Sequence, residues 1–261
     1  MKTTLKKMAG FAGFQPIWER LFRTALSGMN IGEGGGVVCS GESFVLDVLF
    51  ANLNSQPPFI IFDVGANVGD YAEQVISKLS NKVELYCFEP AASSYSRLES
   101  RLAGREGVHL SNIAMGEKDD SLILYSNAPE SGIASFYKRR LDHFGITMEI
   151  PETVKVSTID IFCQEHGIDF IHFLKLDVEG HELEVLKGAE LLLAKDGVGA
   201  IQFEFGGCNI DSRTFFQDFY YLLNGRFKLF RVLKKGLFPI ENYKETYEIF
   251  ITTNFLALSR E

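Results

Sequence analysis

From residue 59 onward, apolar runs of strand length alternate with amphipathic segments of helical period. Residues 59–64 form a continuous apolar run that ends in Asp63-Val64-Gly65, which predicts a strand buried on both faces. Four similar runs predict strands at 83–88, 108–111, 171–176 and 198–205. The segments around them predict helices at 69–79, 92–103, 158–166, 181–194 and 213–223. This rhythm requires parallel strands and right-handed crossovers, so we expect an α/β fold with a doubly wound, mostly parallel sheet.

Both ends of the chain depart from this rhythm. Residues 1–58 read as a helical appendage, in which a Gly-rich turn at 31–36 separates an N-terminal helix from a second helix at 41–53. We expect the first helix to pack four apolar side chains, Phe14, Trp18, Leu21 and Phe22, on the main domain. At the other end, residues 226–233 and a strand within 248–259 predict an antiparallel hairpin at the sheet edge. The main domain then spans residues 59–261.

One internal segment lacks periodicity. Residues 126–151 lie between short strand candidates at 121–125 and 154–156, and a loop of that length is usually functional or disordered. We interpret an insertion at about 126–153 as a lid or an acceptor-binding element, with a passive surface loop as the alternative. A basic cleft made by Lys138, Arg139 and Arg140 would suit a phosphorylated or acidic acceptor.

Charge is unevenly spread along the 261 residues, whose formal net charge is -8. The excess of acid argues against a nucleic-acid partner. Residues 1–30 nevertheless carry +4, from five Lys and Arg residues against Glu19, which leaves -12 for the rest. This basic helix is a candidate for peripheral contact with an anionic membrane or a partner, and a solvated helix is the alternative.

Two further features bear on location and redox state. No apolar run approaches the ~20 residues that span a bilayer, and no signal peptide is recognisable, so we expect a cytoplasmic protein. The four cysteines, Cys39, Cys87, Cys163 and Cys208, lack metal-site spacing. Cys87 lies in an apolar run and Cys163 in a helical one, so both are expected to be buried thiols.

The first strand ends in a glycine-rich turn that predicts a cofactor site. The turn reads Asp63-Val64-Gly65-Ala66-Asn67-Val68-Gly69, where Gly65 permits a sharp turn and Gly69 a close approach at the helix start. The helix N-terminus could then bind an anionic group such as a methionine carboxylate. An acid at Asp63 is unfavourable beside a pyrophosphate but suits a cofactor with an ammonium and a sulfonium. The turn therefore favours S-adenosylmethionine over a nicotinamide cofactor.

The next two strand ends extend this site. Glu89 ends the second strand, where a carboxylate can accept hydrogen bonds from both ribose hydroxyls. Asn112 follows the third strand and could bond the adenine edge, with Ile113 and Ala114 lining its face. A solvated strand-end acid is the alternative for Glu89.

The strand at 171–176 opens into a charged segment with catalytic candidates. Lys175 and Asp177 share one strand face, and Glu179 and His181 follow at the start of a helix. His181 is a candidate general base, and Asp177 could orient the acceptor, hold the methionine ammonium or bind Mg²⁺ together with Glu204. Alternatively, Glu179 and Glu182 merely cap the helix.

Three of these segments together resemble the FkbM-type methyltransferase family. They are Asp63–Gly69, Phe88-Glu89-Pro90 and Lys175–Glu182, and the similarity runs from about residue 59 to residue 205. The resemblance implies a Rossmann-like class I methyltransferase that uses S-adenosylmethionine. It implies a hydroxyl acceptor on a sugar, glycolipid or polyketide-type natural product. A nitrogen or protein acceptor, a nicotinamide-dependent oxidoreductase and a non-catalytic nucleotide-binding module remain as alternatives.

Overall fold

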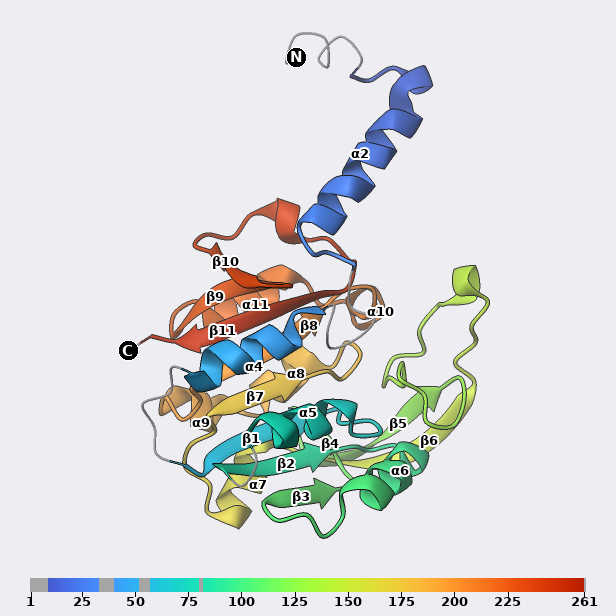
Figure 1. Ribbon diagram of the computed structural model, residues 1–261. Coiled ribbons are helices and arrows are strands. Elements are labelled where there is room, and N and C mark those ends of the chain that lie inside the picture. Colours follow the sequence, from blue (N-terminus) through green and yellow to red (C-terminus); the bar gives the residue numbers. More distant parts are fainter. Residues whose placement is uncertain (1–8, 33–39, 52–56, 80–81, 261) are drawn as a thin grey trace.

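An eight-stranded sheet forms the centre of the computed structural model, which describes residues 9–32, 40–51, 57–79 and 82–260 (Figure 1). The strand order is β10-β9-β11-β8-β7-β1-β2-β3. The strands are β1 (Phe59–Val64), β2 (Val83–Phe88), β3 (Val108–Ser111), β7 (Phe173–Leu176), β8 (Ala200–Phe205), β9 (Phe227–Leu233), β10 (Gly236–Ile240) and β11 (Thr253–Ser259). Strands β1, β2, β3, β7 and β8 pair in parallel, whereas β9, β10 and β11 make antiparallel pairs. The predicted α/β fold class is confirmed.

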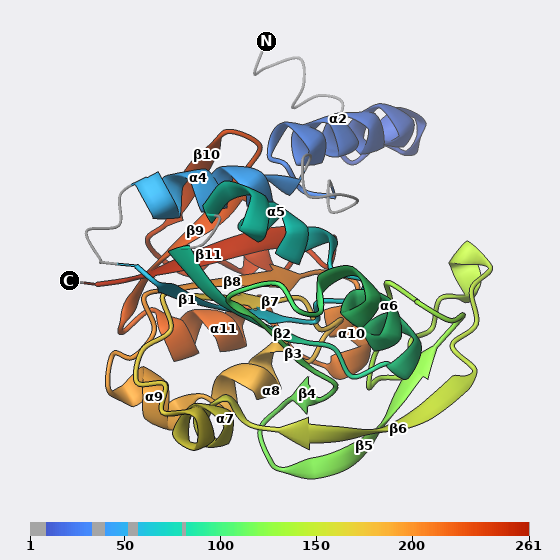
Figure 2. The same cartoon turned by 60° about the horizontal axis from the view of Figure 1, so that its bottom comes forward.

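Helices cover both faces of this sheet (Figure 2). One face carries α4 (Glu42–Ala51), α5 (Asp70–Leu79) and α6 (Ala92–Leu102). The other carries α7 (Ile159–His166), α8 (Glu182–Lys187), α9 (Glu190–Ala194) and α11 (Phe216–Leu223). Val45 and Leu46 of α4 are fully buried in the same cluster as β1. Helix α4, predicted from the sequence to belong to the N-terminal appendage, therefore packs in the core of the main sheet.

Several helices and strands differ in extent or pairing from those predicted from the sequence. The helix expected at 181–194 is split into α8 and α9 where Gly188 packs on backbone, and a Cβ there would lie 1.9 Å from the carbonyl oxygen of Gly116. The helix expected at 213–223 starts only at Phe216, after the short α10 (Cys208–Ser212). The edge hairpin is present but is formed by β9 and β10, while β11 lies between β9 and β8.

A smaller sheet stands beside the main one, with the order β4-β6-β5. It consists of β4 (Ala114–Met115), β5 (Asp120–Ser126) and β6 (Ile150–Ser157), and β5 and β6 pair antiparallel. Residues 127–149 connect β5 to β6 and contain one 3-10 turn, η3 (Asp142–Phe144). This ribbon and loop correspond to the aperiodic insertion expected from the sequence.

The N-terminal helix α2 (Gln15–Gly28) follows η1 (Ala12–Phe14) and projects from the domain (Figure 1). Phe14, Leu21 and Phe22 are exposed, so the expectation that they pack on the main domain is wrong. Leu26 is the only side chain of α2 that is buried in the described structure. Only the last turn of the helix reaches the domain.

Two smaller expectations have clear outcomes. Cys87 and Cys163 are buried free thiols as predicted, Cys208 is also a buried free thiol, and Cys39 lies outside the described residues. No helix within the described ranges is long and apolar enough to cross a membrane.

Candidate active site

A cavity opens where the strand order reverses. The chain runs from β1 to β2 and β3 on one side, then crosses to β7 and β8 on the other, so β1 and β7 flank the switch point at which α/β sheets bind ligands. The cavity encloses about 650 Å³ of space, part of which is open to solvent. Its walls come from residues that follow β1, β2 and β7, and from β4, β5 and the 127–149 loop.

The turn after β1 contributes Gly65 and Asn67 to the cavity wall. Gly65 has φ +87°, and a Cβ there would lie 1.9 Å from the carbonyl oxygen of Asp177, so only glycine allows β1 and β7 to approach so closely. Asn67 has φ +46°, and its side-chain Oδ1 is buried without a hydrogen-bond partner in the described structure. This buried oxygen is a candidate acceptor for a hydrogen bond from a ligand.

The amides of this turn are already bonded within the chain. Gly65 N and Ala66 N both donate to Phe88 O, at 2.9 and 3.0 Å, and Gly69 N donates to Ala66 O. Ala66 and Gly69 do not line the cavity. A Cβ on Gly69 would lie 2.8 Å from Leu98 Cδ1, so Gly69 serves the packing of α5 on α6. The amides of Gly65, Ala66 and Gly69 are therefore not free to bind a ligand.

Glu89, directly after β2, lines the cavity and joins two strand ends. Its Oε2 accepts a 2.8 Å bond from Asn67 N, and its Oε1 accepts a 2.9 Å bond from Ala91 N. Burial raises the pKa of Glu89 to about 7, against the lowering effect of these two backbone donors. Each carboxylate oxygen has a second lone pair for a ligand.

The two residues predicted to contact the adenine, Ala114 and Asn112, differ in whether they line the cavity. Ala114 lines the cavity from β4. The Asn112 amide instead donates to Glu89 O at 2.8 Å and to Pro90 O at 3.0 Å, outside the cavity wall. Asn112 thus holds the backbone that carries Glu89.

Behind the cavity, Lys175 is buried among three carboxylates. Its Nζ lies 3.0 Å from Asp177 Oδ2, 3.7 Å from Asp63 Oδ1 and 3.9 Å from Glu42 Oε1, and 4.7 Å from the centre of the Tyr71 ring. Of these residues only Asp177 lines the cavity. Asp63 is fully buried, its pKa is raised to about 6 by burial, and neither oxygen has a hydrogen bond in the described structure. The cluster holds more negative than positive charge next to the cavity.

Glu42, at the start of α4, had no signal in the sequence. It is buried and reaches Lys175 across the sheet face, and Gln202 Nε2 donates to it at 3.2 Å. A single acid before an apolar helix resembles any helix start, because the pattern carries no information on its distant partner.

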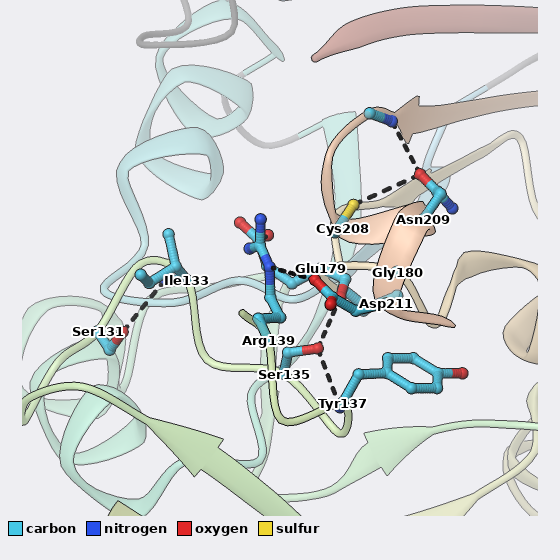
Figure 3. Close-up of polar contacts among 12 residues, drawn as sticks. Ser131, Ile133, Ser135, Tyr137, Arg139, Glu179, Gly180, Cys208, Asn209 and Asp211 are labelled. Carbon is cyan, nitrogen blue, oxygen red and sulfur yellow. Dashed lines mark hydrogen bonds and ion pairs between the residues drawn. The ribbon is translucent and has the colours of Figure 1, made fainter. Parts of the chain in front are cut away.

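Glu179 enters the cavity wall from the turn after β7, with a left-handed φ of +51°. Its carboxylate pairs with Arg139 of the 127–149 loop, and its carbonyl oxygen accepts a 2.7 Å bond from Ser135 Oγ (Figure 3). Burial raises the pKa of Glu179 to about 7, although Arg139 lowers it. Arg139 Nε also lies 3.9 Å from Asp211 Oδ2, so the loop is fastened to the turn and to α10.

The same loop covers the cavity. Ser131, Gly132, Ala134 and Phe136 contribute to its wall, although no short motif in the sequence singles them out. The lack of periodicity was the only signal. Arg139 is engaged with acids of the core, so it does not form the open basic cleft that the sequence suggested.

His181 and Glu182 lie away from the cavity wall. His181 is buried, with Nδ1 3.2 Å from the Tyr137 hydroxyl and its ring 4.7 Å from that of Phe136, and burial lowers its pKa to about 4. Glu182 Oε1 accepts bonds from Val178 N and Gly180 N at 3.0 and 3.2 Å, which is the capping alternative.

Asp177 and Glu204, the two metal-ligand candidates from the sequence, are not part of a group of ligands in the described structure. Glu204 is held near Asp177 and Glu179, and burial first, then these acids, raise its pKa well above the usual range. Across the described ranges, no three His, Cys, Asp or Glu side chains are arranged to hold a metal ion.

Comparison with known proteins identifies the family. The family model described as "Methyltransferase FkbM domain" matches residues 63–229, from the end of β1 into β9. The chain belongs to the FkbM methyltransferase family. The description of this family names methyl transfer and not a nicotinamide-dependent oxidation.

Two relatives carry more specific names. A 2-O-methyltransferase NoeI of Sinorhizobium fredii is 24% identical over 153 residues, covering 55% of this chain and 63% of that protein. A hexuronic acid methyltransferase AglP of Haloferax volcanii is 27% identical over 151 residues, covering 57% of this chain and 56% of that protein. The matches thus span less than two thirds of either relative. A crystal structure of a methyltransferase FkbM from Methylobacillus flagellatus is 17% identical, with a TM-score of 0.49, covering 79% of this chain and 45% of that one.

Proposed function

We propose that this methyltransferase uses S-adenosylmethionine to methylate a hydroxyl of a sugar, a glycolipid or a polyketide-type natural product. The observation that carries the proposal is the cavity at the β1/β7 switch point, with Glu89 beside it on the end of β2. The names of the two relatives, a 2-O-methyltransferase and a hexuronic acid methyltransferase, support a sugar hydroxyl as the acceptor.

The residues present fit this cofactor. Glu89 has lone pairs for the ribose hydroxyls, and the buried Oδ1 of Asn67 is an acceptor without a partner in the described structure. The carboxylates of Asp63, Asp177 and Glu42 surround a single ammonium, so the adjoining cavity favours a cationic ligand group. In the proposal, Asp177 faces the methionine ammonium, and Lys175, which also pairs with Asp63, holds Asp177 in place.

When bound, S-adenosylmethionine supplies the methyl group, and the acceptor hydroxyl must lose its proton. We assign the acceptance of that proton to Glu179. Its carboxylate is in the cavity wall, and a pKa near 7 leaves a large fraction in the basic form at neutral pH. Arg139 and the left-handed turn orient the carboxylate. The buried His181 lies outside the cavity wall, so the general-base role suggested for it is reassigned to Glu179.

Binding is the first test. Calorimetric titration of the full chain with S-adenosylmethionine and, separately, NADH should show binding of the first alone. Glu89→Ala should weaken it by about tenfold or more, because a charge-assisted hydrogen bond contributes about 1.5–3 kcal/mol. Binding of NADH, or of neither ligand, would overturn the cofactor assignment.

Turnover tests the acceptor and the base. Transfer of a labelled methyl group is measured with neutral sugars, uronic acids, glycolipids and polyketides, with peptides and amines as nitrogen acceptors. Glu179→Gln should reduce kcat by about a hundredfold or more while leaving cofactor affinity nearly unchanged. Glu130→Gln, at an exposed acid of the same loop, is the matched control. Label found only on nitrogen would contradict O-methylation. An unaltered kcat in Glu179→Gln would exclude Glu179 as the general base.

A further inference from the structure

The projecting helix α2 has one apolar face that no other part of the described structure covers. Its members recur every three or four residues and so share one side of the helix. They are Phe14, Ile17, Leu21 and Phe22. All four are between 37% and 55% exposed, an unusual state for large apolar side chains in one continuous stripe. Trp18, four residues from both Phe14 and Phe22, lies on the same side of the helix and is half-buried.

The opposite face is basic. Arg20 and Arg23 are exposed there, next to Glu19. With the three lysines that precede the helix in the sequence, residues 1–30 carry a formal charge of +4, whereas the rest of the chain carries -12. An apolar face rich in aromatic residues beside a basic face characterises helices that lie in a membrane interface.

We propose that α2 binds an anionic lipid surface, with its apolar stripe in the headgroup region and its basic residues among the lipid phosphates. Charge decides between this surface and a second copy of α2, because two basic helices packed face to face would repel. Each Lys or Arg near an anionic leaflet strengthens binding by about fivefold, whereas it weakens pairing with another cation.

The position of the helix suits this role. Its C-terminal end is anchored, since Asn30 Nδ2 donates to the carbonyl oxygens of Ser40 and Val232 and Gly32 N donates to Thr252 O at 2.9 Å. From there α2 extends away from the sheet domain (Figure 1). Fourteen residues span about 21 Å, which exceeds the ~8 Å Debye length at physiological salt. Most of the helix therefore escapes the repulsion between the acidic domain and an anionic surface.

Trp18 is the only tryptophan in the chain, so its fluorescence reports this face directly. The full-length protein is mixed with vesicles of phosphatidylcholine containing about one third phosphatidylglycerol, a charged fraction that gives a strong surface potential. We expect the emission to shift to shorter wavelength and the protein to sediment with the vesicles. Neutral phosphatidylcholine vesicles should bind at least tenfold less, and ~1 M salt should release the protein from anionic vesicles.

Variants separate the apolar and the basic contributions. Ile17→Gln with Leu21→Gln should abolish binding. Arg20→Gln with Arg23→Gln should weaken binding by about 25-fold, because each of the two cations contributes about fivefold. Leu191→Gln on α9 removes a 65% exposed leucine elsewhere and should leave binding unchanged. Circular dichroism and cofactor titration verify that each variant is folded.

Two results would overturn the proposal. One is the absence of co-sedimentation with anionic vesicles. The other is a dimer mass in light scattering that disappears in the Ile17→Gln and Leu21→Gln variant, together with a Trp18 emission that lipid does not change. In that case a second copy covers the helix. Neither readout depends on methyl transfer, so the result is independent of the proposed function.

Discussion

The affinity of the cavity for S-adenosylmethionine should rise with pH because of Glu89. Both oxygens of this carboxyl already accept a backbone N–H, and burial still raises its pKa to about 7. Ribose hydroxyls donate hydrogen bonds, which favour the charged carboxylate over the neutral acid. Binding should therefore lower the pKa of Glu89 and release a proton. This prediction rests on the proposed cofactor.

The size of the effect follows from the pKa. With a pKa of about 7, roughly one tenth of Glu89 is charged at pH 6 and roughly nine tenths at pH 8. If only the charged form binds well, the dissociation constant falls about tenfold over this interval, which corresponds to about 1.4 kcal/mol. At pH 7, about half a proton should be released per ligand bound.

Calorimetry measures both quantities. Titrations at pH 6, 7 and 8, repeated in buffers with different ionisation enthalpies, give the affinity and the number of protons released. Glu89→Gln retains an acceptor oxygen but cannot ionise, so its affinity should be lower and lose most of the pH dependence. Glu179→Gln, which removes the other cavity carboxyl with a pKa of about 7, should keep the dependence. A pH-independent affinity of the wild type, or a slope that survives in Glu89→Gln, would refute the reasoning.

Three further predictions concern stability, each measured by urea unfolding of the free protein. Gly65→Ala should lower the free energy of unfolding by more than about 3 kcal/mol, because a positive φ is combined with a 1.9 Å approach to a backbone oxygen. Gly104 has a similar φ of +76° in open space, so Gly104→Ala should lower it by only about 1–2 kcal/mol. Equal losses in the two variants would contradict the steric argument. Glu182 has a folded pKa of about 8, raised by burial from an ordinary value near 4.5, so stability should be full below about pH 4.5 and fall by up to about 4 kcal/mol as the pH rises to 8. Glu182→Gln should flatten that slope, and an unchanged slope would assign it to other acids. Lys175→Met should lower the free energy of unfolding by about 3–5 kcal/mol at pH 8, and by less at pH 5, where the buried carboxyls become protonated. Lys78→Met removes a surface ion pair and should lower it by under about 1 kcal/mol. Similar losses in the two variants would argue against a buried cluster.

Local patterns determined the positions of most core elements. Periods of buried and exposed residues marked β1, β2, β7 and β8 within a few residues, because a strand buried on both faces has a distinctive apolar run. Once these strands were parallel, their carboxyl ends had to meet at one edge. That geometry explains why Gly65, Asn67, Glu89, Asp177 and Glu179, although far apart in the chain, were all predicted site residues and all line one cavity.

The same patterns misassigned residues whose role depends on a distant partner. Gly69 and Asn112 have the right place in the chain for a ligand, but Gly69 packs against Leu98 and Asn112 holds the backbone at Glu89. His181 has the right chemistry for a base but packs against Phe136. A residue type at a strand end indicates that it is near the site, and only the tertiary contacts show which way it faces.

The sequence by itself determined the doubly wound sheet, the residues at its carboxyl edge and the amphipathic character of α2. The tertiary structure decided that Arg139 of the loop meets Glu179, that Glu42 reaches Lys175, and that the apolar face of α2 stays exposed. The physical reason is one of range. Periodicity records which side of an element avoids water, and that is set by neighbours within a few residues. The partner of a buried charge or an apolar face comes from another part of the chain, and its identity is fixed only when the whole fold closes.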